Sequence, residues 1–250
     1  MKFIDVFLIA VFLFFIGSTS GWVLEVFFRR FCSAKKWINP GFLTGPYLPL
    51  YGFGVVGLFG ISLIPVDTGM YWLDSLLIIL IMGVVMTVIE YIAGLIFIKG
   101  MKIRLWDYSD RWGNIQGIIC PLFSFFWLIV SALFYFFIDK PVIDAITWFV
   151  HHIEFAFVVG MFAGAFLIDL AHAFDLSTKI RKFANEHKVV VNLEKLKETL
   201  YEKVEEVEHK RPNFVFPLKR FGGFKEQMAE LKDKFSSQNK EENEEEKSTR

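Results

Sequence analysis

The sequence has few cysteines and no surplus of charge. Its two cysteines, Cys32 and Cys120, are too few for a disulfide framework or a cysteine metal cluster. Lys and Arg number 27, as do Asp and Glu, so the formal net charge is zero and gives no indication of nucleic-acid binding. No G-x-x-x-x-G-K-[ST] phosphate loop occurs, so any nucleotide hydrolysis must reside in another chain. The sequence therefore predicts no metal site, no cofactor and no nucleic-acid partner.

Apolar residues are abundant instead. They make up 54% of the 250 residues, and the mean hydropathy is +0.44, which is typical of a protein whose partner is the lipid bilayer. A bilayer core about 30 Å thick requires roughly 20 helical residues to cross it. The segments of sufficient length are 3–28, 47–64, 73–98, 113–138 and 148–174. We therefore predict an all-α integral membrane protein, with a bundle of about five transmembrane helices over residues 1–175.

The end of the chain has a different composition. Charged residues dominate after residue 175, and apolar residues recur among them at spacings of three and four, as on one face of a helix. This pattern predicts an amphipathic helical tail over 176–235. The polar, Glu-rich segment 236–250 is predicted to be a disordered acidic C-terminus.

The loop charges predict an orientation in the membrane. Basic residues follow the first and third apolar segments, whereas the opposite side carries mainly aspartates: Asp67, Asp74, Asp139 and Asp144. Cytoplasmic loops are enriched in Lys and Arg, so the N-terminus is predicted outside and the tail in the cytoplasm.

The stretch Asn39–Gly54, which contains Pro40, Pro46 and Pro49, cannot be one unbroken helix. Broken backbone at membrane depth must line a cavity or be covered by protein, because lipid offers its N–H and C=O groups no partners. We therefore predict a functional site here. The alternative is an ordinary connection in which a proline starts the second helix.

Four acidic residues, Glu25, Glu90, Glu154 and Asp169, lie in or at the ends of the apolar segments. A charge at the centre of a membrane helix costs roughly 2.5 to 3.5 kcal/mol on insertion scales, so each requires a reason. Glu25 has Arg29 four residues later, and Asp169 has His172 three residues later, so ion pairs would explain both. Glu90 has no such neighbour, which makes it the strongest candidate for a polar cavity.

Two Gly-x-x-x-Gly pairs, at Gly17–Gly21 and Gly160–Gly164, predict close helix packing. The loop after the third segment adds Trp106 to Ser109, where Trp106 and Tyr108 are alternatively ordinary interfacial anchors. The polar residues of the cytoplasmic half predict an inward-facing cavity. Its predicted substrate-binding residues are Glu25, Asn39, Glu90, Asp107, Tyr108 and Asn114.

The spaced motifs of residues 1–140 resemble a known family. They are Glu25, then N-x-G-F-L-x-G-P-x-x-P-x-Y-G-x-G from Asn39, then Glu90-Tyr91, then Trp106-Asp107-Tyr108-Ser109 with Asn114, Gly117 and Cys120. This series resembles the family called putative ABC-transporter type IV, or CmpB-like, membrane proteins. Pro40 and Pro121 depart from the family pattern. The residues that carry the motif structurally would be Gly41, Phe42, Gly45, Pro46, Pro49, Tyr51, Gly52 and Trp106.

The resemblance implies a bacterial inner-membrane protein that acts as, or with, a permease. Our leading interpretation is a transport protein with Glu90 as a cation, proton or amine site, working as a homo-oligomer or with a separate ATPase or other subunit. An accessory protein that acts through its cytoplasmic tail is the alternative. A third is a lipid-modifying enzyme with Glu90 or Asp107 as general base. No Ser-His-acid constellation or dense His/Asp metal cluster supports an enzyme, so we assign no catalytic residue.

Overall fold

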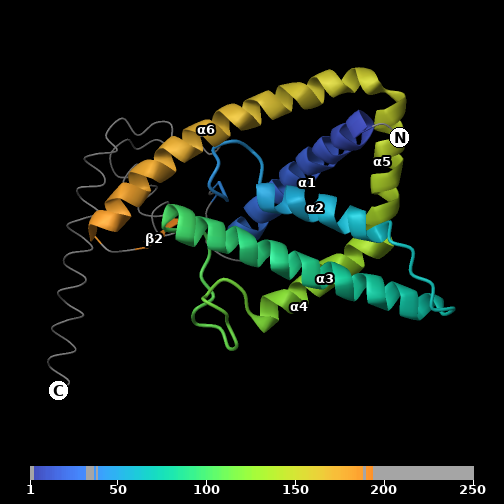
Figure 1. The fold of residues 1–250 in the computed structure, drawn as a ribbon, viewed down its shortest axis with the longest axis horizontal. Coiled ribbons are helices and arrows are strands. Elements are labelled where there is room, and N and C mark those ends of the chain that lie inside the picture. The colour runs from blue at the N-terminus through green and yellow to red at the C-terminus, as the bar shows by residue number, and fades with distance from the viewer. Residues whose placement is uncertain (1–2, 32–36, 38, 188–189, 194–250) are drawn as a thin grey trace.

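The computed structural model describes residues 3–31, 37, 39–187 and 190–193, and these residues are mostly helical (Figure 1). The elements are α1 (Phe3–Phe31), α2 (Pro49–Ser62), α3 (Tyr71–Leu95), α4 (Pro121–Leu133), α5 (Asp139–His151) and α6 (Ala156–His187). Short π-helical segments follow α3 (Ile96–Met101) and α4 (Phe134–Ile138), and a 3₁₀ turn (Ile153–Phe155) precedes α6. Two-residue strands, β1 (Ile103–Arg104) and β2 (Val191–Asn192), pair in parallel.

Four stretches of the described chain are long and apolar enough to cross a membrane. They are Phe3–Phe31, Tyr71–Met101, Pro121–His151 and Ile153–Glu186. The prediction of an all-α integral membrane protein is therefore confirmed. The second expected span, 47–64, is a helix of only 14 residues, about 21 Å long, because Pro49 starts it and a turn ends it before Pro65.

The short helix α2 packs antiparallel on α1, and the glycines make this contact possible. A Cβ at Gly21 would overlap the Tyr51 ring, and one at Gly52 would overlap Ser18 and Phe14. The loop before α2 reaches back along α1, where Leu48 N donates to Ser18 O at 3.0 Å. Ser18 lies 13 residues before the end of α1, or about 20 Å along its axis. The loop 39–48 therefore re-enters the bundle, and loop and short helix together occupy the depth of one span.

The fourth segment differs from the expected 113–138. Its helix begins only at Pro121 and continues through a π-helical segment into α5, where the sequence predicted an external loop. A π segment is a known cause of sharp helix bends. In Figure 1, α5 lies across the end of the bundle nearest the N-terminus, while α1, α2, α3 and α6 run lengthwise.

The helix α6 is 32 residues long, about 48 Å, and runs without interruption past residue 175. The start of the predicted tail, through His187, is thus a continuation of this helix; residues 194–250 lie outside the described chain. Apart from the adjoining residues and backbone of α6 itself, no atom of the described structure lies within 4 Å of a Cβ built on Gly160 or Gly164. The second glycine pair therefore faces outward and makes no packing contact there.

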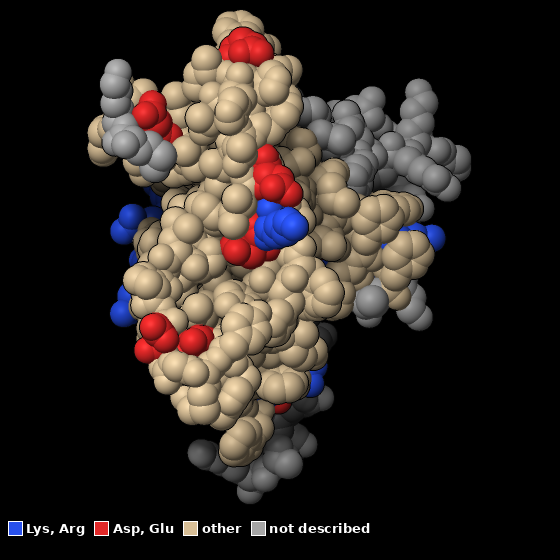
Figure 2. All heavy atoms as spheres, turned by 90° about the vertical axis from the view of Figure 1, so that its right-hand side faces the viewer, with Lys and Arg blue, Asp and Glu red and all other residues tan. Residues whose placement is uncertain are grey.

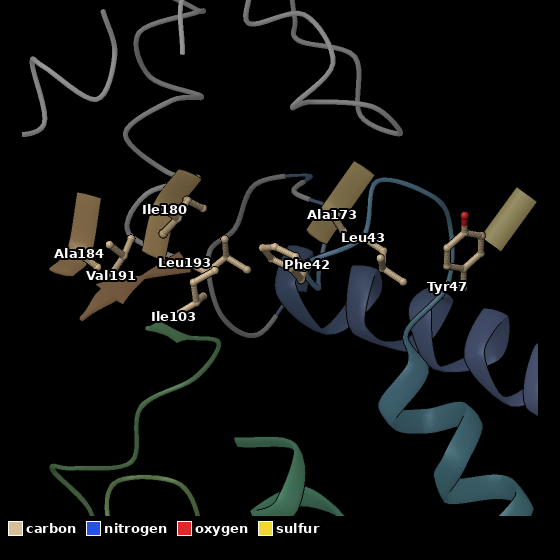
Figure 3. Close-up of a cluster of buried hydrophobic side chains, with 9 residues drawn as sticks. All are labelled: Phe42, Leu43, Tyr47, Ile103, Ala173, Ile180, Ala184, Val191 and Leu193. Atoms are coloured by element: carbon tan, nitrogen blue, oxygen red, sulfur yellow. The ribbon is translucent and has the colours of Figure 1, made fainter. Parts of the chain in front are cut away.

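One buried apolar cluster joins four distant segments at the other end of the bundle. We call it the basal cluster: Phe42, Leu43, Tyr47, Ile103, Ala173, Ile180, Ala184, Val191 and Leu193. Figure 3 shows these side chains in a row from Ala184 and Val191 to Tyr47. The re-entrant loop, the segment after α3, the second half of α6 and the strand β2 all meet here.

Charge is divided between the two ends. Figure 2 faces the end at which α5 lies, where carboxylates outnumber basic side chains on an otherwise apolar surface. Arg29 and Arg30 lie in the last turn of α1, at the opposite end. This separation matches the loop charges of the sequence, while the side of the membrane that each end faces stays a prediction.

Candidate functional site

Three buried or partly buried carboxylates each accept a hydrogen bond from a tyrosine hydroxyl. The pairs are Tyr51 with Glu25, Tyr108 with Glu90, and Tyr47 with Asp169. Two of the tyrosines come from the Asn39–Gly54 stretch and the third from the loop after α3. The polar centres of the bundle are thus built between helices and loops, not along single helices.

Asp169 of α6 satisfies the broken backbone of the re-entrant loop. Its carboxylate accepts from Thr44 N at 3.0 Å, Gly45 N at 2.8 Å and Tyr47 OH at 3.0 Å, and also from the Thr44 hydroxyl. Lipid has no acceptors for such N–H groups, so a carboxylate from a neighbouring helix takes that role. This explains an acid that is only 7% exposed.

Asn39 holds the loop from its other side. Its Nδ2 donates to Thr44 O at 3.0 Å, and its Oδ1 accepts from Trp22 Nε1 of α1 at 2.7 Å. Gly41 adopts a φ of +78°, with Leu48 packed where a Cβ would stand. The Gly/Pro stretch is therefore a loop covered by protein, followed by a helix that Pro49 starts, as the alternative interpretation predicted; a functional site at this stretch stays a prediction.

Glu90 differs from Glu25 in having no ion pair with a basic side chain in the described part of the chain. It lies on α3, is 4% exposed, and accepts from Trp127 Nε1 at 2.9 Å and Tyr108 OH at 3.1 Å. Both donors are neutral. In the part of the chain that the structure describes, none of the ion pairs includes Glu90. An intramembrane carboxylate in such surroundings requires a proton or a cation as its counter-charge.

Glu25 forms the ion pair that its spacing predicted, with Arg29 Nε at 3.2 Å. It also accepts from Tyr51 OH at 3.1 Å. The Tyr51 ring in turn lies 6.2 Å, between centroids, from the ring of Trp127, the donor to Glu90. Two aromatic side chains therefore connect Glu25 to Glu90.

The loop after α3 is held together by its own polar groups. Asp107 accepts from Arg104 Nη1 at 2.6 Å and from Ser109 N at 3.0 Å, and Asn114 Nδ2 donates to Ser109 O at 3.0 Å. Burial would raise the pKa of Asp107, but the hydrogen bonds from Ser109 and Arg104 outweigh it and lower the pKa below its usual value. Asp107 and Asn114 thus shape the loop and do not reach Glu90 directly.

The aromatic residues of this loop divide into inward and outward groups. Trp106 Nε1 donates to Ile118 O at 2.9 Å, and the Tyr108 ring stacks on Phe123 at 4.1 Å. Burial and the Glu90 carboxylate raise the pKa of Tyr108, so its hydroxyl stays a donor at neutral pH. The outward side chain is Trp112, which is 88% exposed.

A family model, described as Putative ABC-transporter type IV, matches residues 12–174. The chain belongs to this family. The match continues past residue 140, where the motif resemblance ended, and includes the first part of α6, up to residue 174, with Asp169. Comparison with curated proteins and with solved structures gave no match.

The type IV chain brings only some of the predicted site residues together. Glu25, Glu90 and Tyr108 join one group through Tyr51 and Trp127, whereas Asn39 lies with Asp169 and the loop. Their role in substrate binding stays a prediction. Trp127 and Thr44 were not singled out from the sequence, because a tryptophan in an apolar run and a threonine in a loop carry no pattern of their own.

Proposed function

We propose that this chain is a permease-like membrane transport protein in which Glu90 binds a cation or a proton on its way through the bundle. The observation that carries the proposal is that a buried carboxylate on α3 has only neutral hydrogen-bond donors. Such a group exchanges its counter-charge with the transported species more readily than one fixed by an arginine.

The cavity we propose opens toward the basic end of the bundle. Tyr108, on the loop after α3, covers the Glu90 carboxylate on this side. Glu25 and Tyr51 provide further polar groups near Glu90. Displacement of Tyr108 would give Glu90 access to water, with Glu25 as the next acceptor for a cation. Asp107 and Asn114 would act by holding the loop that carries Tyr108.

The re-entrant loop supplies the other element that transport proteins use. Broken helices at membrane depth let neighbouring elements shift around a bound solute. Here the loop is attached to α1 through Asn39 and to α6 through Asp169, so a movement of α6 would be transmitted to α2.

In the proposed arrangement the N-terminus lies outside and the tail in the cytoplasm of a bacterial cell, with the protein in the inner membrane. Four long spans and one short helix are few for a complete transporter. We therefore propose a homo-oligomer or a complex with a separate ATPase or other subunit.

One observation favours the accessory alternative. Val191 and Leu193, after α6, are buried in the basal cluster beside the re-entrant loop. The segment that leads into the tail is thus fixed to the membrane domain, as a tether for a cytoplasmic partner would require.

The test compares wild type, Glu90→Gln and Glu154→Gln in liposomes, by thermal unfolding across pH and cation concentration and by flux of protons or cations with an internal dye. Glu154 serves as the control, because it is an exposed carboxylate that makes no hydrogen bond with Glu90, Tyr108 or Trp127. Glu90→Gln should abolish both the dependence of the unfolding temperature on pH or cation concentration and the proton or cation flux. Glu154→Gln should keep both. Wild-type behaviour of Glu90→Gln would contradict the proposal.

A further inference from the structure

Trp112 occupies an unusual position for the largest apolar side chain of a polar loop. It is 88% exposed, and Ile115, three residues later, is 52% exposed. A tryptophan combines an apolar ring with one polar N–H, which suits the boundary between hydrocarbon and water. The loop therefore presents the residue type that membrane interfaces favour.

The outward position is fixed by the backbone and is not the result of a loose loop. Arg111 N donates to Tyr108 O at 2.9 Å, and Gly117 N donates to Asn114 Oδ1 at 3.0 Å. Gly113 has a φ of +67° and packs against Pro121. The tip of the loop is consequently held in place between the ends of α3 and α4.

The direction of the loop identifies what it meets. Figure 1 shows it projecting sideways from the bundle, beside the end of α3, rather than lengthwise beyond it. If the bilayer normal runs along the length of the bundle, a loop that projects sideways beside the end of α3 meets lipid headgroups before it meets the cytoplasm. The charges of this segment also favour an anionic surface. Arg104 and Asp107 offset each other in an ion pair, so the remaining charged side chains are one acid, Asp110, and three cations. The three are Lys99, Lys102 and Arg111.

We propose that Trp112 anchors this loop in the headgroup layer of an anionic membrane, and that the anchoring keeps Tyr108 on Glu90. Trp112 lies four positions after Tyr108, and the backbone hydrogen bond from Arg111 N to Tyr108 O closes the turn between them. The partner of the loop is thus the bilayer, and its lipid composition regulates access to the carboxylate. The second half of this inference rests on the proposed function of Glu90.

The anchoring is tested by fluorescence of the full chain in phosphatidylcholine vesicles with and without phosphatidylglycerol. The signal of Trp112 is the difference between wild type and Trp112→Phe. We expect brominated phospholipid to quench it several-fold more strongly than aqueous iodide, with a larger effect in the anionic vesicles. The corresponding difference for Trp72→Phe, in the first turn of α3, calibrates quenching at the opposite interface. Quenching by iodide alone would place the Trp112 ring in water and overturn the proposal.

The coupling is tested by labelling with a hydrophobic carbodiimide, which reacts with protonated carboxyl groups in apolar surroundings, and by mapping the adduct on Glu90. Trp112→Ser should increase the labelling several-fold, as should Tyr108→Phe, which removes the hydroxyl directly. If Tyr108→Phe increases it and Trp112→Ser does not, the coupling is overturned.

The two proposals fail separately. Loss of the cation dependence in Glu90→Gln, together with iodide-accessible Trp112, overturns the lipid anchor and supports the proposed function. Lipid-quenched Trp112 with a silent Glu90→Gln supports the anchor and overturns the proposed function.

Discussion

Gly45 and Asp169 are 124 residues apart in the sequence and are joined by a buried hydrogen bond of 2.8 Å from Gly45 N to Asp169 Oδ2. This bond and its neighbours make α6 the acceptor for a loop that would otherwise present unpaired N–H groups inside the membrane. Asp169 is thus explained by a structural role, as the acceptor for the loop backbone. Within the described residues, Glu90 accepts no backbone N–H of this kind.

Asp169→Asn should destabilise the protein. The amide replaces one acceptor oxygen by a donor and leaves a buried backbone N–H unpaired, which costs roughly 1 to 3 kcal/mol for each such group. Thermal unfolding in detergent measures the effect. Asp175→Asn is the control, because Asp175 is an exposed side chain of the same helix that pairs only at the surface with Lys179. Equal midpoints for the two variants would contradict the assigned role.

Gly21→Ala should weaken the contact between α1 and α2. The added Cβ overlaps the Tyr51 ring, and overpacking of this kind costs roughly 1 to 3 kcal/mol. Gly160→Ala is matched in chemistry, but its Cβ meets nothing within 4 Å, and alanine favours a helix over glycine by up to about 1 kcal/mol, so its unfolding midpoint should not fall below that of wild type. If Gly160→Ala is the more damaging of the two, α6 has a partner that the single chain does not show.

A double-mutant cycle between Glu90→Leu, which removes the acceptor, and Trp127→Phe, which removes the donor, should give a favourable coupling energy. A hydrogen bond contributes roughly 0.5 to 1.5 kcal/mol when the carboxyl group is protonated and roughly 1.5 to 3 kcal/mol when it is charged, and the residues contact directly at 2.9 Å. Chemical or thermal unfolding of the four proteins supplies the cycle. A coupling energy near zero would show that the indole does not hold the carboxylate.

The loop after α3 should loosen in acid. Folding lowers the pKa of Asp107, so its carboxylate stabilises the loop above the unfolded value of about 3.9, and this contribution is lost as the pH falls through the folded pKa. The side chain is 39% exposed, so solvent screening keeps the effect small. Proteolysis of the loop across this pH range measures it. Asp107→Asn should be cleaved somewhat faster than wild type already at neutral pH, whereas Asp110→Asn should behave as wild type.

The position of a tail truncation should decide whether the membrane domain stays folded. A chain that ends at Leu193 keeps the buried Val191 and Leu193, whereas one that ends at Lys188 loses both from the basal cluster. We expect the longer chain to unfold at the wild-type temperature and the shorter one at a lower temperature. Loss of function in the longer chain, with the wild-type unfolding temperature and the wild-type carbodiimide labelling of Glu90 both kept, would support the accessory alternative.

Local chemistry was sufficient for several features. The apolar runs predicted helices, Gly17 and Gly21 predicted a close helix contact, and Glu25 with Arg29 predicted an ion pair within one helix. Each depends on residues at helical spacing, which the sequence displays directly. The segment boundaries at 47–64 and 113–138 were less accurate, because hydropathy does not mark where a re-entrant loop or a structured polar loop replaces helix.

The sequence by itself determined that this is a helical membrane protein, that the chain breaks at Asn39–Gly54, and that Glu90 has no helical neighbour to neutralise it. Only the tertiary structure decided which groups meet across long separations: Asp169 with Gly45, Glu90 with Trp127 and Tyr108, and β1 with β2. The physical reason is that helix periodicity and hydropathy act over a few residues, whereas the partner of a buried polar group is selected by the packing of whole helices. For the same reason Trp106 and Trp112, similar in sequence, face inward and outward: the fold of their loop decides it.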